Sequence, residues 1–119
     1  MARYEHLPIF RAAFDLAVHI EKIVKHFSRY HKYTLGSELR NRSRQIVEAI
    51  IHANSEREQR RQFLLSLRED LEQFKVLTRL CHESGGFQST RAYLYVSEQI
   101  VNIAKQNEGW LRMKSQGRG

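Results

Sequence analysis

The residues most able to do chemistry in this chain are long cations that recur in a row. Their spacings are four, seven, seven and four residues, and they are Arg57, Arg61, Arg68, Lys75 and Arg79. On an α-helix, at about 100° per residue and about 1.5 Å of rise, they fall within about 40° of arc over roughly 33 Å. Such a row on a rigid support can contact the phosphates of a nucleic acid without reading its bases. We call these five residues the basic ridge and predict that they bind nucleic acid.

Two further cations lie one helical turn apart in the preceding segment. Arg40 and Arg44 can act together on phosphate groups, so we add them to the candidate nucleic-acid-binding residues. The whole chain carries 20 Lys and Arg against 13 Asp and Glu, which leaves a formal charge of +7 with neutral histidines. This balance favours an acidic partner, with nucleic acid first.

Two tyrosines, Tyr30 and Tyr33, stand between cations in a segment that reads as a corner. One interpretation is that they stack on unpaired bases. The other is that they close the end of the core and leave their hydroxyls in water. We favour the second interpretation.

No set of residues in the sequence points to catalysis or to a metal site. Gly85 and Gly86 lack the strand and the Lys-Ser/Thr signature of a phosphate-binding loop. His19 and His26 are seven residues apart, without a further ligand at a suitable spacing. Cys81 falls in an apolar helical stripe, which is typical of a small buried hydrophobe. We therefore expect a protein that is not an enzyme and that uses no cofactor and no metal.

Apolar residues recur three and four apart in four stretches, which predicts four amphipathic helices. The stretches run from Pro8 to about Tyr30, from Leu35 to Ala53, from Arg57 to Ser84, and from Ser89 or Thr90 onward. The strongest break is Ser84-Gly85-Gly86, which reads as a helix stop. We predict an all-α, up-down-up-down antiparallel four-helix bundle, a single domain over residues 1–115. Gly109 should weaken the last helix, and residues 112–119 should form a loose basic tail.

Four apolar residues lie outside the core stripes of the first and fourth helices. They are Phe14, Val18, Leu94 and Val101. Either they are scattered surface residues, which need no explanation, or they contact another subunit or partner. We name them the outer apolar residues.

Some charges have a predicted structural role. Arg42 falls inside the apolar stripe of the second helix, so it must reach outward or be paired, and Asp70 is a candidate partner. The mixed-sign run that holds Glu56, Glu58 and Arg60 is typical of a solvated helix face.

The remaining features indicate the compartment. A single cysteine excludes an internal disulfide and is typical of a reducing compartment. The first residues lack an apolar signal core, and no apolar run approaches the ~20 residues of a membrane span. We expect a soluble cytoplasmic protein without membrane contact.

Three segments resemble one known family. Leu7-Pro8-Ile9 opens the first helix, residues 27–40 form the corner, and Ile50-Ile51-His52-Ala53-Asn54-Ser55 ends the second helix. They resemble the accessory variability determinant (Avd), the small basic four-helix protein of diversity-generating retroelements. The chain is also similar to the wider four-helix-bundle family encoded in intervening sequences of bacterial large-subunit ribosomal RNA.

The resemblance to Avd implies a homopentamer with a basic surface. It implies an accessory that binds the element's reverse transcriptase and nucleic acid, the template RNA and also DNA. Such a protein supports mutagenic retrohoming, while the polymerase does the chemistry. Two alternatives remain open: an oligomeric four-helix scaffold that binds protein only, and an intervening-sequence-encoded bundle protein without a polymerase partner.

Overall fold

The computed structural model describes residues 3–117, with side chains from residue 4 to residue 113. Its four long helices are α1 (Pro8–Lys25), α3 (Leu35–Ser55), α4 (Arg60–Glu83) and α5 (Thr90–Gly117). Three short helices complete it: η1 (Arg3–His6), α2 (Arg29–Lys32) and η2 (Arg57–Gln59). No strand occurs within residues 3–117. The predicted all-α class is therefore confirmed.

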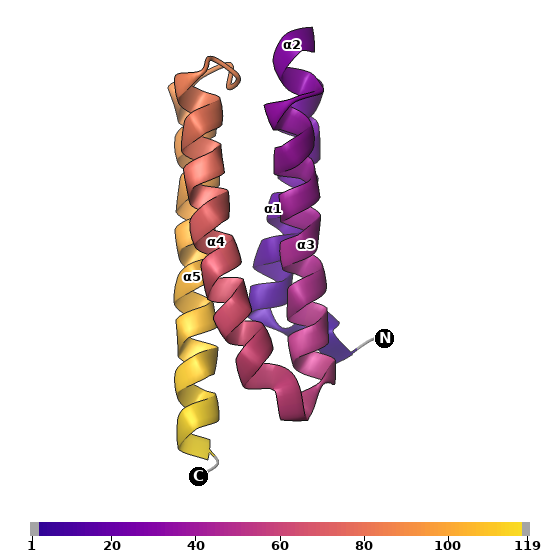
Figure 1. Cartoon of the computed structure of the whole chain (residues 1–119), viewed down its shortest axis with the longest axis vertical. Helices are drawn as coiled ribbons and strands as arrows, with labels where there is room; N and C mark the ends of the chain where they lie inside the picture. Colours follow the sequence, from indigo (N-terminus) through magenta and orange to yellow (C-terminus); the bar gives the residue numbers. More distant parts are fainter. Residues whose placement is uncertain (1–2, 118–119) are drawn as a thin grey trace.

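The four long helices pack together into a rod of 49 × 27 × 20 Å (Figure 1). Most of the buried apolar residues form one large cluster, and Ala53, Leu64 and Leu111 form a second, smaller cluster. Helix α3 packs against α1 and α4, and α5 packs against α4 and α1, so each long helix has two neighbours. Figure 1 shows α2 at the end of the rod that lies away from η1 and from the last turns of α5. This arrangement is a four-helix bundle, as the apolar stripes predict.

The buried faces follow the predicted stripes closely. In α1 the buried residues are Ile9, Phe10, Ala13, Leu16, Ile20 and Val24. In α4 they are Leu64, Leu67, Leu71, Phe74, Leu77, Thr78 and Cys81. Because such spacing puts the apolar side chains on one face, burying that face brings the helices together.

The first corner is tighter than the sequence suggests. Helix α1 ends at Lys25 instead of continuing to about Tyr30. Gly36, in the first turn of α3, leaves no room for a side chain, because a Cβ atom would lie 2.8 Å from Cγ1 of Val24 and 2.9 Å from the carbonyl oxygen of His31. Thr34 directly precedes α3, but its hydroxyl donates to the carbonyl oxygen of Tyr30 at 2.8 Å and does not cap α3.

The break between α4 and α5 is confirmed. Gly85 has a φ of +88°, in the left-handed region that favours glycine. The Gly86 N–H donates to the carbonyl oxygen of Cys81 at 2.8 Å, and the Gly85 N–H donates to that of His82 at 3.1 Å. This pattern is a Schellman motif, which satisfies carbonyls at the end of the helix. Ser89 caps α5, because its Oγ accepts the Ala92 N–H at 3.1 Å.

The corner between α3 and α4 is held by a residue that the sequence placed in solvent. Arg60 is partly buried, and its Nε and Nη2 donate to the carbonyl oxygens of Ala53 and Asn54 at 2.7 and 2.9 Å. Its guanidinium also lies 5.6 Å from the ring of Trp110. The prediction of a solvated Arg60 is therefore wrong, because the side chain binds the last carbonyls of α3.

The last helix is continuous as far as residue 117. Helix α5 passes through Gly109 without a break. The backbone of residues 112–117 continues the same helix, and residues 118–119 of the expected tail lie outside the described residues.

The predicted pairing of Arg42 with Asp70 is also wrong. Nη1 of Arg42 donates to Oε1 of Gln73 at 2.7 Å. Partial burial raises the pKa of Asp70, nearby Arg42 acts against this rise, and Glu69 adds to it. The cation therefore influences the carboxyl from a distance without forming an ion pair with it.

Candidate functional site

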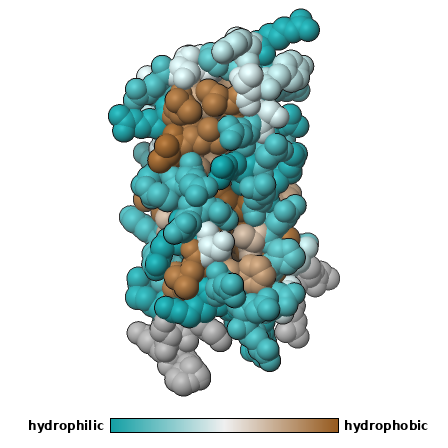
Figure 2. Space-filling view, in the orientation of Figure 1, coloured by the Kyte–Doolittle hydropathy of each residue, from teal (hydrophilic) through white to brown (hydrophobic). Residues whose placement is uncertain are grey.

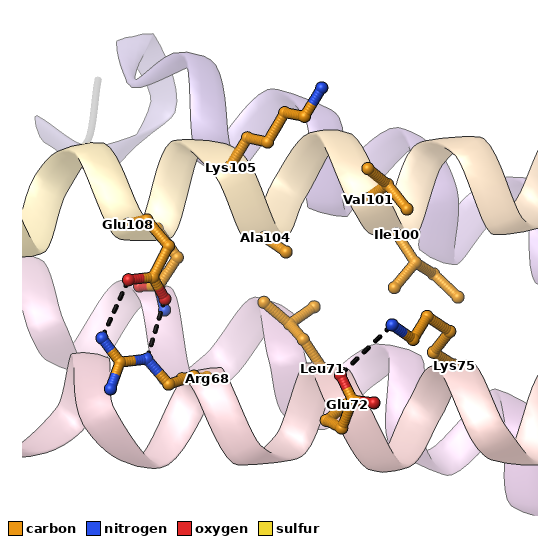
Figure 3. A pocket seen from close by; sticks show the side chains of 10 residues that line it. Arg68, Leu71, Glu72, Lys75, Ile100, Val101, Ala104, Lys105 and Glu108 are labelled. Carbon is orange, nitrogen blue, oxygen red and sulfur yellow. Dashed lines mark hydrogen bonds and ion pairs between the residues drawn. The ribbon is translucent and has the colours of Figure 1, made fainter.

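The cations of the basic ridge are exposed, but they do not all lie on one helix. All five side chains are exposed; Arg57 lies in η2 and the other four on α4. Arg68 reaches across to α5, where its Nε and Nη2 both bind the carboxylate of Glu108 at 2.8 Å (Figure 3). This contact places the ridge on the flank of α4 that faces α5.

Acidic neighbours interrupt the single sign of the ridge. Besides Arg68, Lys75 pairs with Glu72 at 3.3 Å, and Arg79 pairs with Glu83 at 2.9 Å. Three of the five ridge cations therefore have acidic partners, which the spacing of the cations alone does not reveal because the carboxylates lie on adjacent turns and on α5. These pairs are exposed, and exposed ion pairs contribute little to stability, so a phosphate can compete with each carboxylate.

The pKa values in the ridge agree with these pairs. The hydrogen bond from Arg68 lowers the pKa of Glu108. Glu83 raises the pKa of Arg79 through its hydrogen bond and its charge. Both effects favour the charged forms of Arg79 and Glu108.

A groove of about 280 Å³ runs between α4 and α5 beside the ridge (Figure 3). Leu71, Ile100 and Ala104 supply apolar surface, while Arg68 and Lys75 line it with their cationic side chains. The ridge cations Arg68 and Lys75 therefore border an apolar surface.

Arg40 and Arg44 lie one turn apart on one face of α3, as predicted, but they share a carboxylate. Nε of Arg40 lies 2.9 Å from Oε1 of Glu21, and Nη1 of Arg44 lies 3.5 Å from Oε2 of the same residue. Arg44 also donates to Oδ1 of Asn41 at 2.6 Å. Part of their charge is therefore used to join α3 to α1.

The outer apolar residues Phe14, Val18, Leu94 and Val101 are all exposed, between 39% and 51%. Phe14 lies partly against Phe10, with ring centroids 5.7 Å apart. Their exposure is what a contact surface requires, although it also fits scattered surface residues.

Helix α4 exposes two more apolar residues that the sequence reading missed. Val76 and Leu80 are 61% and 51% exposed and lie one turn apart. Figure 2 shows a hydrophobic patch over α4, toward the α2 end of the rod. Their spacing of four residues off the core stripe is the signal that could have found them.

The corner tyrosines do not close the core, so that interpretation is wrong. Tyr30 is 76% and Tyr33 71% exposed. A hollow of about 400 Å³ lies beside Tyr33, between the end of α1, α2 and the start of α3. Its lining residues are Glu21, Lys22, Val24, Lys25, Lys32, Tyr33 and Arg40, and we call it the corner pocket.

The described residues offer little for catalysis or metal binding. Among them, no three His, Cys, Asp or Glu side chains are grouped so as to hold a metal ion. Burial raises the pKa of the Cys81 thiol to about 12, so the thiol stays protonated at neutral pH. His19 packs edge-on against Tyr95, with ring centroids 4.5 Å apart. None of the helices in the described part is both long and apolar enough to span a membrane.

No protein-family model matches the chain, and neither does any curated protein. Function is therefore inferred from the residues and their geometry.

Proposed function

We propose that this protein binds nucleic acid through its phosphates, as the basic accessory of a diversity-generating retroelement. Its ligands are the template RNA and DNA, its protein partner is the element's reverse transcriptase, and it supports mutagenic retrohoming without catalysing a reaction. The observation that carries the proposal is the basic ridge, five exposed cations of which four lie on α4 and Arg57 lies in the preceding η2. Arg40 and Arg44 extend the basic surface onto α3.

The ion pairs along the ridge are compatible with this function. Each carboxylate that pairs with Arg68, Lys75 or Arg79 lies at the surface, where it can return to water when a phosphate replaces it. When many phosphates replace carboxylates in this way, condensed cations are released from the nucleic acid. This release drives binding and makes the affinity depend steeply on salt.

In the same proposal the protein is a cytoplasmic homo-oligomer, and the resemblance to Avd implies a pentamer. Its helices alternate in direction, which the short connections and the positions of the helix ends in Figure 1 support. The outer apolar residues, together with Val76 and Leu80, supply surface for a second subunit or for the polymerase.

The apolar patch on α4 favours a second candidate, an oligomeric scaffold that binds protein only. On that reading, the positive charge aids solubility, and nucleic-acid affinity shows no specific dependence on the ridge. Replacing Leu94 and Val101 with Ser would then abolish partner binding. An intervening-sequence protein shares the fold and differs in its genomic setting, so a neighbouring reverse transcriptase gene with a variable repeat favours the first proposal over it.

The direct test reverses charges on the ridge. The variant carries Arg61→Glu, Arg68→Glu and Arg79→Glu, and its matched control carries Arg11→Glu, Arg91→Glu and Arg112→Glu, all at exposed positions. Each triple lowers the net charge by six, from +7 to +1. We expect the ridge variant to lose RNA binding in a fluorescence anisotropy titration, whereas the control keeps most of it. Equal losses would show that overall charge, and not the ridge, governs binding, and circular dichroism checks that both variants remain helical.

A further inference from the structure

The corner pocket combines positive charge with an exposed aromatic ring. It is lined by Lys22 and Lys25 from the last turns of α1, by Lys32 from α2, and by Arg40 from α3. Four cations thus surround a hollow of about 400 Å³ that holds one carboxylate, Glu21. The pocket is open to solvent. Helix α2, which carries Lys32, lies at one end of the rod (Figure 1).

The three lysines of the pocket keep their charge available. Within the described residues, no carboxylate lies within ion-pair distance of Lys22, Lys25 or Lys32. Glu21 is already bound by Arg40 at 2.9 Å and by Arg44 at 3.5 Å. In this respect the corner pocket differs from the ridge, where three cations already have acidic partners.

The aromatic member is Tyr33, which directly follows α2. Its side chain is 71% exposed, and Nζ of Lys32 lies 5.9 Å from the centroid of its ring. The backbone beneath it is held by the close approach of Gly36 to Val24 and by the hydrogen bond from Thr34 to the carbonyl oxygen of Tyr30. An exposed ring on a fixed backbone offers a flat face at low entropic cost.

We infer that the corner pocket binds single-stranded nucleic acid, with phosphates on Lys22, Lys25 and Lys32 and an unpaired base stacked on Tyr33. This inference rests on the proposed function and deepens it by naming the form of the ligand. Aromatic side chains beside a basic groove bind single strands because every base has a face that can stack. Bases inside a duplex are already stacked on one another, so the ring adds affinity for single strands only. An acidic protein segment would use the same lysines but would not require a stacking face.

The test compares two tyrosines that are almost equally exposed. Tyr33→Ala removes the ring that lines the pocket, and Tyr30→Ala removes a ring three residues away that does not line it. Tyr33→Phe keeps the stacking face. Affinity is measured by fluorescence anisotropy for an unstructured RNA of about 12 nucleotides and for a duplex of the same length. The length lies within the about 4–16 nucleotides that one OB fold covers on a single strand.

We expect Tyr33→Ala to weaken single-strand binding by about fivefold or more, since stacking of one base is worth about 1–3 kcal/mol, or roughly five- to 150-fold. Duplex binding should change by less than about twofold, and Tyr33→Phe and Tyr30→Ala should stay within about twofold of the wild type on both ligands. Replacing Lys22, Lys25 and Lys32 with Gln should reduce the slope of log affinity against log salt by about two on single strands, at about 0.7 per phosphate contact.

Several outcomes would overturn the inference. Unchanged single-strand affinity in Tyr33→Ala would do so, as would equal losses in Tyr33→Ala and Tyr30→Ala. A poly-glutamate competitor that displaces RNA from the wild type and from Tyr33→Ala equally well would indicate an acidic protein ligand instead. If charge reversal of the ridge abolishes binding while Tyr33→Ala has no effect, the proposed function stands and this inference fails. If the wild type binds neither ligand at about 50 mM salt, where phosphate contacts are strong, both fail.

Discussion

Removing the carboxylates that pair with the basic ridge should strengthen nucleic-acid binding. The variant carries Glu72→Gln, Glu83→Gln and Glu108→Gln, which release Lys75, Arg79 and Arg68 from their ion pairs. In the wild type, a phosphate that displaces one of these carboxylates leaves an anion that attracts salt cations again. The variant has no such anion, so each phosphate contact releases salt cations from the nucleic acid and none are taken up again by a freed carboxylate.

The expected size of the effect follows from the number of pairs. Each released cation adds up to about 0.7 to the slope of log affinity against log salt for single strands, and about 0.9 for duplex DNA. Three pairs therefore make the slope steeper by up to about 2 for single strands and about 2.7 for duplex DNA. Gln is chosen because it keeps the length of the side chain while it removes the charge.

The assay is an anisotropy titration of labelled RNA repeated at several salt concentrations. The matched control carries Asp15→Asn, Glu48→Gln and Glu98→Gln, three exposed acids that take part in none of the ion pairs described above. Both triples raise the net charge by three, from +7 to +10. Identical slopes in the two triples would show that the ridge cations do not contact phosphates, and would refute the reasoning.

Three further predictions concern stability. Gly36→Ala should lower the free energy of unfolding by about 1–3 kcal/mol, because the new methyl group would be overpacked against Val24 and the His31 carbonyl. Gly109→Ala should raise the free energy of unfolding by about 0.5–1 kcal/mol, because its Cβ would meet no atom nearer than 4.0 Å. Thermal unfolding measures both effects, and a Gly36→Ala variant as stable as the wild type would contradict the account of the corner. Arg60→Met should lower the free energy of unfolding by about 1–3 kcal/mol, because two carbonyls at the end of α3 lose a charged donor. The control Arg57→Met should change the free energy of unfolding little. Urea unfolding measures both variants, and equal effects would count against the role of Arg60. Burial raises the folded-state pKa of Asp70 above 3.8, so ionisation of this carboxyl opposes folding. Asp70→Asn should therefore be slightly more stable than the wild type at pH 7, and this stability difference should shrink as the pH falls through the folded-state pKa and vanish below 3.8. A stability difference that is constant with pH would reject this cause.

The sequence alone determines much of the fold, because helical periodicity is a local property. The stripes that contain Leu16 and Leu67 identify the buried faces, and Gly85 with Ser89 identifies the break between α4 and α5. The exposure of Phe14 and Leu94 also follows from their positions off these stripes. In each case the signal lies within one helix or one turn.

Contacts between helices decide the rest. Arg68 meets Glu108 across 40 positions of sequence, and Arg60 meets the end of α3 and Trp110. The corner pocket exists because the close packing at Gly36 brings the start of α3 against the end of α1. Periodicity shows which face of a helix is apolar, but core packing sets how far each helix is rotated and shifted against its neighbour. Those rotations and shifts decide which charges neutralise one another and which remain available, so only the tertiary structure could separate the paired cations of the ridge from the unpaired lysines of the corner pocket.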